Sequence, residues 1–150
     1  MSYGYASIST KVEKTTIEEL PGAKAITYTL GRFRIKDIYF VTPYSNKSAG
    51  STVIWHDEIP IWQMSYGGRY PKEVVPFLKE CLRESYIKKE FNGGRGPKAR
   101  LSTNKEYVYV NSFIGNFASF CGREAIYSTD NDHGPDQEIG YHTFNGMSLL

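Results

Sequence analysis

The chain has 150 residues and a formal net charge of +2, with 40% apolar and 23% charged residues, as in an ordinary soluble globular protein. This net charge is too small to indicate a nucleic-acid or membrane partner by itself. No stretch approaches the ~18 apolar residues of a membrane helix. The N-terminus lacks the basic segment followed by an apolar segment that is typical of a signal peptide, so we expect a cytoplasmic protein. The length predicts a single domain, residues 1–150, with a proper core.

Strand patterns dominate the first part of the chain. We expect an edge strand within residues 3–10, and then one or two helical turns where Thr15 or Thr16 precedes Glu18 and Glu19 as in a capping box. Alternation of apolar and polar residues predicts further strands up to residue 66, with a polar loop at 43–50. These strands are expected at 25–30, 33–37, 53–55 and 59–66, the last two joined as a hairpin through His56-Asp57-Glu58.

One long helix is predicted after the glycine pair Gly67-Gly68. Apolar residues recur at helical spacing across residues 71–91, and Pro71 suits the first helical position. The run Asn92-Gly93-Gly94 ends the helix. Three further strands are expected at 107–110, 125–127 and 139–144.

Two parts of the chain resemble each other. The first contains an alternating aromatic strand, a strand opened by Gly50 and a strand closed by Gly68, and the second repeats this order with Gly122 and Gly146. We therefore predict an α+β fold in which a twisted antiparallel sheet is built from two similar β units, at about 33–68 and 107–146. This sheet would pack on the helix at about 71–91.

The loop from Gly93 to Arg100 is the first candidate binding site. Its glycines allow close backbone approach, and Arg95, Lys98 and Arg100 place three cations within six residues, as in an anion site. It is not a nucleotide phosphate loop, because it follows a helix and lacks the Gly-Lys-Ser/Thr ending. The alternative is a solvated loop that only connects the helix to the next element.

Aromatic residues are the second candidate feature, at 15% of the chain. Strand alternation divides them between the two faces of a sheet, so some would lie outside the core and stack a base or a sugar. We expect Trp62, Tyr66 and Tyr141 to line a ligand groove together with His142. The alternative is that these rings form core contacts and cross-strand pairs.

His142 is the candidate for catalysis. It lies in the strand that echoes Gln63-Met64, and as a general base with Asp37 or Glu124 nearby it would support a small hydrolase or transferase. A lone histidine in a strand is more often structural, and spacing alone assembles no set of nucleophile, base and orienting group.

No metal or cofactor is expected. The acidic turn around His133 lacks the ligand spacing and closing glutamate of a calcium loop. Cys81 and Cys121 form no C-x-x-C pattern, so we expect two free, buried thiols, with a disulfide as the alternative.

Three segments resemble motifs of a family of uncharacterised bacterial domains that are sometimes fused to helix-turn-helix regulators. They are the run from Ile59 to Gly68, the triplet Arg95-Gly96-Pro97 and the strand from Gly122 to Tyr127. The resemblance covers roughly residues 33–146. It implies a compact prokaryotic or phage domain, such as a sensor, and no activity that can be carried over. The chain has no helix-turn-helix segment of its own, so a regulatory role would need a partner.

These features together favour a non-enzymatic binding domain, a sensor or sequestering protein, for a small anionic, nucleotide-like ligand. Arg95, Lys98 and Arg100 would meet the charge of the ligand, and the aromatic residues would stack its ring. The alternatives are the small hydrolase or transferase and a protein-interaction module, and binding of nucleic acid is not favoured. We also expect a homodimer that pairs through a sheet edge, either near residues 3–8 or near 139–144.

Overall fold

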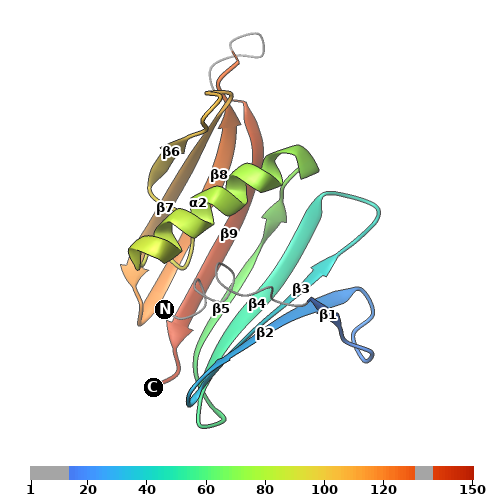
Figure 1. The fold of residues 1–150 in the computed structure, drawn as a ribbon, viewed down its shortest axis with the longest axis vertical. Helices are drawn as coiled ribbons and strands as arrows, with labels where there is room; N and C mark the ends of the chain where they lie inside the picture. The colour runs from blue at the N-terminus through green and yellow to red at the C-terminus, as the bar shows by residue number, and fades with distance from the viewer. Residues whose placement is uncertain (1–13, 131–136) are drawn as a thin grey trace.

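The computed structural model describes residues 14–130 and 137–150, which form one curved antiparallel sheet with a single α-helix lying across it (Figure 1). The strand order is β1-β2-β3-β4-β5-β9-β8-β7-β6. The predicted antiparallel sheet is therefore confirmed, and the strand expected at 3–10 lies outside the described residues. The nine strands are β1 Thr15–Thr16, β2 Ala23–Leu30, β3 Phe33–Val41, β4 Lys47–His56, β5 Ile59–Arg69, β6 Ala99–Leu101, β7 Tyr107–Asn116, β8 Ser119–Ser128 and β9 Glu138–Ser148.

Strand alternation separates a covered face of the sheet from an open one. In β9 the residues Gly140, His142, Phe144 and Gly146 are buried, whereas Thr143 and the other residues between them are more exposed. Because successive side chains of a strand point to opposite faces, β9 places its even-numbered residues toward the helix. We call this helix-covered side the inner face of the sheet and the other side the outer face.

The helix α2 (Val75–Lys88) is shorter than predicted, since it spans 14 residues rather than 71–91. It follows a 3₁₀ turn, η1 (Lys72–Val74), and Pro76 falls in its first turn, where amide groups lack helical partners anyway. Lys89 ends the helix three residues before the predicted stop, because it adopts the left-handed conformation with φ of 56°.

The inner face carries two separate apolar clusters. One cluster joins α2 to β7 and β8 through Phe77, Leu78, Tyr109 and Ile126. The other lies over β3–β5, β8 and β9 and is closed by Phe91, which follows the helix. The second cluster consists of Ile35, Ile54, Trp62, Met64, Phe120 and Phe144, with Tyr28, Ile61, Tyr66, Phe91 and Phe113 packed against it.

A row of paired residues crosses the centre of the sheet from β3 to β7, and its aromatic residues and glycines occur in the same order from either end. At each end an aromatic residue pairs with a glycine, which in turn pairs with a second aromatic residue. The central pair of the row is Tyr66 with Phe144. In strand order the row is Tyr39, Gly50, Tyr66, Phe144, Gly122 and Phe113.

Several predicted details were wrong. Thr15 and Thr16 form β1 against β2 instead of starting helical turns. The polar loop predicted at 43–50 is shorter, because β4 already begins at Lys47. The strand near 139–144 is not an edge, since β9 lies between β5 and β8, and the edges among the described residues are β1 and β6. Cys121 is free but exposed, whereas Cys81 is free and buried as expected.

Candidate functional site

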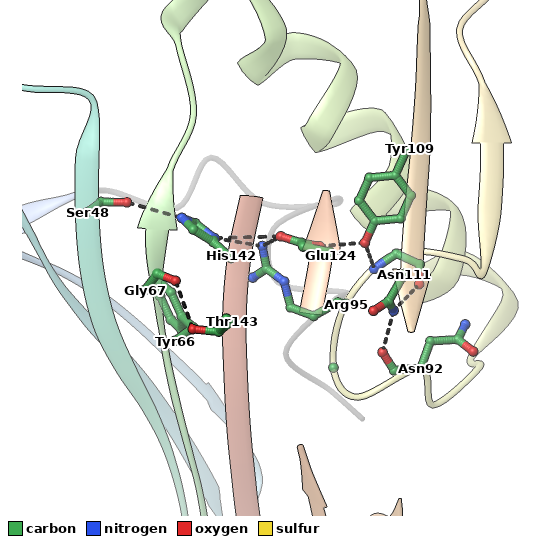
Figure 2. Close-up of polar contacts among 12 residues, drawn as sticks. Ser48, Tyr66, Gly67, Asn92, Arg95, Tyr109, Asn111, Glu124, His142 and Thr143 are labelled. Atoms are coloured by element: carbon green, nitrogen blue, oxygen red, sulfur yellow. Dashed lines mark hydrogen bonds and ion pairs between the residues drawn. The ribbon is translucent and has the colours of Figure 1, made fainter. Parts of the chain in front are cut away.

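A row of polar residues crosses the inner face of the sheet (Figure 2). It lies between the two apolar clusters. Cross-strand pairing places Ser48, Gly68, His142, Glu124 and Asn111 side by side on β4, β5, β9, β8 and β7. His142 and Asn111 are buried, at 7% and 4% exposure, and Glu124 is fully buried. Charged and polar groups at this depth need partners, so the contacts within this row determine what the site can do.

Gly68 makes room for the imidazole of His142. A Cβ atom at position 68 would lie 2.9 Å from Cδ2 of His142 and 2.0 Å from the carbonyl oxygen of Tyr141. The imidazole can therefore extend over β5, where its Nε2 lies 3.3 Å from Oγ of Ser48 on the next strand. A side chain at position 68 would break this contact.

Arg95 reaches the row from the loop that follows α2. Its guanidinium Nη2 forms a short ion pair with Oε1 of Glu124 and lies 3.3 Å from Nδ1 of His142. The loop is held down on β7, because the amide of Gly96 donates to Oη of Tyr109 at 2.9 Å and Asn111 Nδ2 donates to the carbonyl oxygens of Asn92 and Gly96. Tyr109 in turn donates to Glu124.

The glycines of this loop serve packing against the sheet. A Cβ atom at Gly96 would lie 2.7 Å from the ring of Tyr109, and one at Gly93 would lie 2.4 Å from the ring of Phe144. The loop thus approaches the sheet directly, and it inserts Arg95 between the two apolar clusters. This packing accounts for the glycine-rich sequence without an anion.

Asp37 lies in a second polar group on the inner face. Its carboxylate accepts hydrogen bonds from Tyr66 Oη at 2.9 Å and from Thr52 Oγ1 at 3.0 Å, and it is 4% exposed. The guanidinium of Arg95 lies 5.6 Å from the centre of the Tyr66 ring, so the two groups are neighbours. The structure therefore brings together five of the residues expected at a site: Asp37, Tyr66, Arg95, Glu124 and His142.

The surroundings of His142 favour its neutral form. Burial, and after it the adjacent charge of Arg95, together lower the pKa of His142 to about 3. Burial alone would lower the pKa of Arg95, but Glu124 raises it well above the ordinary value, so Arg95 stays charged. Burial and Glu124 together raise the pKa of Tyr109, which keeps its proton to donate to the carboxylate.

The contacts of His142 also determine its tautomer. A guanidinium can only donate hydrogen bonds, so Nδ1 of His142 must accept from Arg95. The proton of the neutral ring is then on Nε2, which donates to Ser48.

Ser48, His142 and Glu124 follow the order of a serine, histidine and acid triad, with Nδ1 of His142 3.6 Å from Glu124 Oε1. A triad needs a free lone pair on Nε2, however, and this tautomer has a proton there. The arrangement thus argues against His142 as a general base.

The other predicted ligand residues lie elsewhere. Arg100 pairs with Glu80 and Glu84 on α2, and Lys98 is exposed. Trp62 is buried and stacks on Phe117 and Phe120, beside a cavity of only about 70 Å³. Tyr141 lies on the outer face of β9, opposite to its neighbour His142, so the predicted groove of Trp62, Tyr66, Tyr141 and His142 does not form.

An open groove of about 540 Å³ lies where the ends of β3 and β5 meet the starts of β4 and β9. Its floor on the outer face contains Ala49, Gly67 and Thr143, which pair across adjacent strands, with Phe40 beside Ala49. The small floor residues create this hollow beside the larger side chain of Phe40. Lys47, Ser48 and Tyr141 also line it.

Two cations pair beside this groove, of which Lys47 lines it and Arg69 does not. Lys47 pairs directly with Arg69 on β5, and Arg69 pairs on its other side with Tyr141. Both cations are exposed, and neither has a carboxylate partner among residues 14–130 and 137–150. Neither cation lies in a strand expected from the sequence, since Lys47 falls in the polar loop expected at 43–50 and Arg69 follows the strand expected at 59–66. Extending the alternation of β4 back to Lys47 and that of β5 forward to Arg69 would have placed both cations on the outer face.

Among the described residues, no group of three histidine, cysteine, aspartate or glutamate side chains is placed to hold a metal ion. No helix in this part of the chain is long and apolar enough to span a membrane.

Comparison with known proteins places the chain in a family. The model of the family described as "Domain of unknown function (DUF5680)" matches residues 37–143, so the chain belongs to this family. The expected membership of a family of uncharacterised domains is thereby confirmed. No curated protein and no solved structure matches the chain.

The buried ion pair predicts a large loss of stability when its acid is neutralised. Glu124→Gln should lower the free energy of unfolding by about 3–5 kcal/mol, because Arg95 would keep its charge without a carboxylate. Glu138→Gln is the matched control, since Glu138 pairs with Arg123 at a more exposed site and should cost at most about 1 kcal/mol. Urea denaturation measures both values, and equal losses would contradict the account of the buried pair.

His142 predicts a specific dependence of stability on pH. Its pKa is about 3 in the folded protein and 6.5 ordinarily, so the unfolded chain binds more protons between these values. The stability contributed by neutral His142 is complete above pH 6.5 and is lost as pH falls toward 3. Between pH 7 and pH 5, wild type should lose about 2 kcal/mol relative to His142→Gln, measured by urea denaturation at each pH. Parallel curves for the two proteins would show that His142 titrates normally.

Proposed function

We propose that this member of the family is a non-enzymatic binding domain for a small anionic, nucleotide-like ligand, held in the outer groove. The observation that carries the proposal is the pairing of Lys47 with Arg69 beside Tyr141. Sensor and sequestering protein are the two roles that such a domain would serve.

The cation pair has an electrostatic cost that a bound anion would relieve. Like charges directly opposite each other on neighbouring strands destabilise a sheet. Several other arginines are neutralised by carboxylates, as with Arg95 by Glu124 and Arg100 by Glu80 and Glu84. Lys47 and Arg69 are exposed and are the cations best placed for a phosphate.

The groove also provides room and aromatic surface for a ring. Its volume of about 540 Å³ is within the ~300–1,000 Å³ typical of small-molecule sites, whereas the cavity beside Trp62, at about 70 Å³, is far below it. Phe40 is 44% exposed at one side of the floor, and Tyr141 lies at another. Stacking of a base on such a ring contributes about 1–3 kcal/mol.

Calorimetric titration with nucleoside mono- and diphosphates, cyclic nucleotides and the parent nucleosides tests the proposal. Wild type should bind a phosphate-bearing compound with Kd below about 1 mM, and more weakly as salt rises. The double variant Lys47→Gln/Arg69→Gln should weaken this binding by at least about tenfold, since both charge-assisted contacts are lost.

Lys98→Gln is the matched control, because it removes one exposed positive charge from the loop first predicted as the anion site. It should leave the affinity within about twofold of wild type, as expected for a charge outside the site. No binding tighter than about millimolar would overturn the proposal. Loss of affinity in Lys98→Gln alone would show that the ligand binds the loop from Gly93 to Arg100 instead of the groove.

We further propose that residues 33–68 and 107–146 are two similar β units. The central row supports this, because Gly50 pairs with Tyr66 as Gly122 pairs with Phe144. In both places the aromatic ring lies over the glycine, since an added Cβ would be 2.6 Å from the hydroxyl of Tyr66 or 2.6 Å from Cζ of Phe144.

Two similar units predict similar effects of matched substitutions. Gly50→Ala and Gly122→Ala should each lower the free energy of unfolding, by about 1–3 kcal/mol, because the ring opposite must move. Gly67→Ala is the control, as its Cβ would approach other atoms only to 3.3 Å. A large loss at one glycine and none at the other, measured by thermal unfolding, would contradict the equivalence.

The location, the origin and the assembly of the protein belong to the same proposal. A cytoplasmic protein of prokaryotic or phage origin is consistent with a soluble ligand, and the homodimer remains a prediction. If the dimer pairs through an edge of the described sheet, that edge is β1 or β6, because β9 is central.

A further inference from the structure

Three successive residue pairs of β4 and β5 lie on the outer face and form a ladder of cations, small residues and hydroxyl groups. In order along the strands they are Lys47 with Arg69, Ala49 with Gly67, and Ser51 with Ser65. Consecutive pairs on one face are two residues apart, so the hydroxyl pair lies about 14 Å along the strands from the cation pair. The groove contains Lys47, Ala49 and Gly67, and the hydroxyl pair adjoins it on the same face.

The hydroxyl pair is held by Gln63, the next outer-face residue of β5. Its Nε2 donates to Oγ of Ser51 and to Oγ of Ser65, each at 2.7 Å. The Ser51 hydroxyl donates in turn to the carbonyl oxygen of Met64 at 3.1 Å. The Ser65 hydroxyl has no acceptor for its own proton among residues 14–130 and 137–150. Ser65 is therefore a positioned donor with a proton left for a ligand.

Asn145 extends this polar end of the ladder onto β9. It pairs with Ser65 across the strands, and its side chain is exposed on the outer face. Its amide has no hydrogen-bond partner within the described part of the chain. A primary amide both donates and accepts, and such a group matches the donor and acceptor atoms along the edge of a nucleobase.

The small residues between the two polar ends leave room for a ligand against the strands. Ala49 and Gly67 carry at most one side-chain carbon, and Phe40 lies beside Ala49 on β3 with 44% of its surface exposed. A sugar and a base fit over such a floor beside an aromatic ring. A nucleotide carries phosphate, sugar and base in this order, which is the order of cations, small residues and polar groups along the ladder.

We infer that Ser65 and Asn145 are the specificity-determining residues of the outer groove and bind the edge of a nucleobase. This inference rests on the proposed function, in which Lys47 and Arg69 hold the phosphate. Cations attract any phosphate compound, whereas a fixed hydroxyl beside an amide requires acceptor and donor atoms at particular places. The ligand class is thereby narrowed from phosphate compounds in general to nucleotides.

Calorimetric titration with nucleoside monophosphates and with ribose phosphate, which lacks only the base, tests the inference. Wild type should bind its best nucleotide at least about tenfold more tightly than ribose phosphate. The double variant Ser65→Ala/Asn145→Ala should weaken nucleotide binding by about tenfold and leave the affinity for ribose phosphate within about twofold of wild type.

Ser112→Ala is the matched control for this double variant. Ser112 is an exposed outer-face serine of β7, three strands away from Ser65. Its removal should leave both affinities unchanged. A loss of nucleotide affinity as large as that of the double variant would show that the effect does not come from the hydroxyl pair, and would overturn the inference.

Ala49→Leu tests the path of the ligand between the two ends of the ladder. A leucine side chain would fill the floor between Phe40 and Gly67, so one ligand could no longer reach both ends. The nucleotide affinity should fall to about that of ribose phosphate. Wild-type nucleotide affinity in this variant would contradict a ligand that lies along β4 and β5.

The outcomes distinguish the two proposals. If wild type binds no phosphate-bearing compound, the proposed function fails and base recognition fails with it. If wild type binds nucleotide and ribose phosphate equally well, or if Ser65→Ala/Asn145→Ala keeps the nucleotide affinity, only the role of Ser65 and Asn145 is overturned. Thermal unfolding of each variant confirms that affinities are compared between folded proteins.

Discussion

The buried ion pair of Arg95 and Glu124 is the interaction on which the rest of the structure depends. Glu124 is fully buried and also accepts a hydrogen bond from Tyr109, and the amide of Gly96 donates to Tyr109. The loop after α2 is thereby attached to β7 and β8. A buried carboxylate without these partners would be costly, so the loop, helix and sheet must assemble together.

The same pair determines the chemistry that the protein can perform. Since Arg95 must donate to His142, the imidazole has its proton on the side of Ser48 and cannot act as a general base there. The charge of Arg95 is neutralised by Glu124, so it is not available for an external anion. The interior is thus a structural polar row, whereas Lys47 at the groove and its neighbour Arg69 are exposed and outside that row.

The sheet was predictable because alternation is a local property of the sequence. The strands that begin at Phe33, Ile59 and Tyr107 were expected to begin at those residues, although each extends further than expected, and the helix was expected in the right place although too long. Its end was misjudged because Lys89 adopts a left-handed conformation that usually favours glycine or asparagine. The strand order was not predictable, since it depends on the pairing of β5 with β9, which are far apart in the chain.

The candidate residues were predictable in part. Asp37, Tyr66, Arg95, Glu124 and His142 were singled out, and they do lie together, but their partners reverse the role first expected for Arg95. A sequence shows which residues carry charge, and only the fold shows which charges neutralise each other. Lys47 and Arg69 illustrate this, because cross-strand pairing alone makes them neighbours.

The most direct test of this account is an amide NMR titration with the nucleotide that binds best. The account predicts that shifts concentrate at residues 40–49, 67–69 and 141–143, around the outer groove. Shifts confined to residues 93–100, with none at Lys47 or Arg69, would contradict it. In that case the ligand would bind the basic loop, and the pairing of Arg95 with Glu124 would have to open.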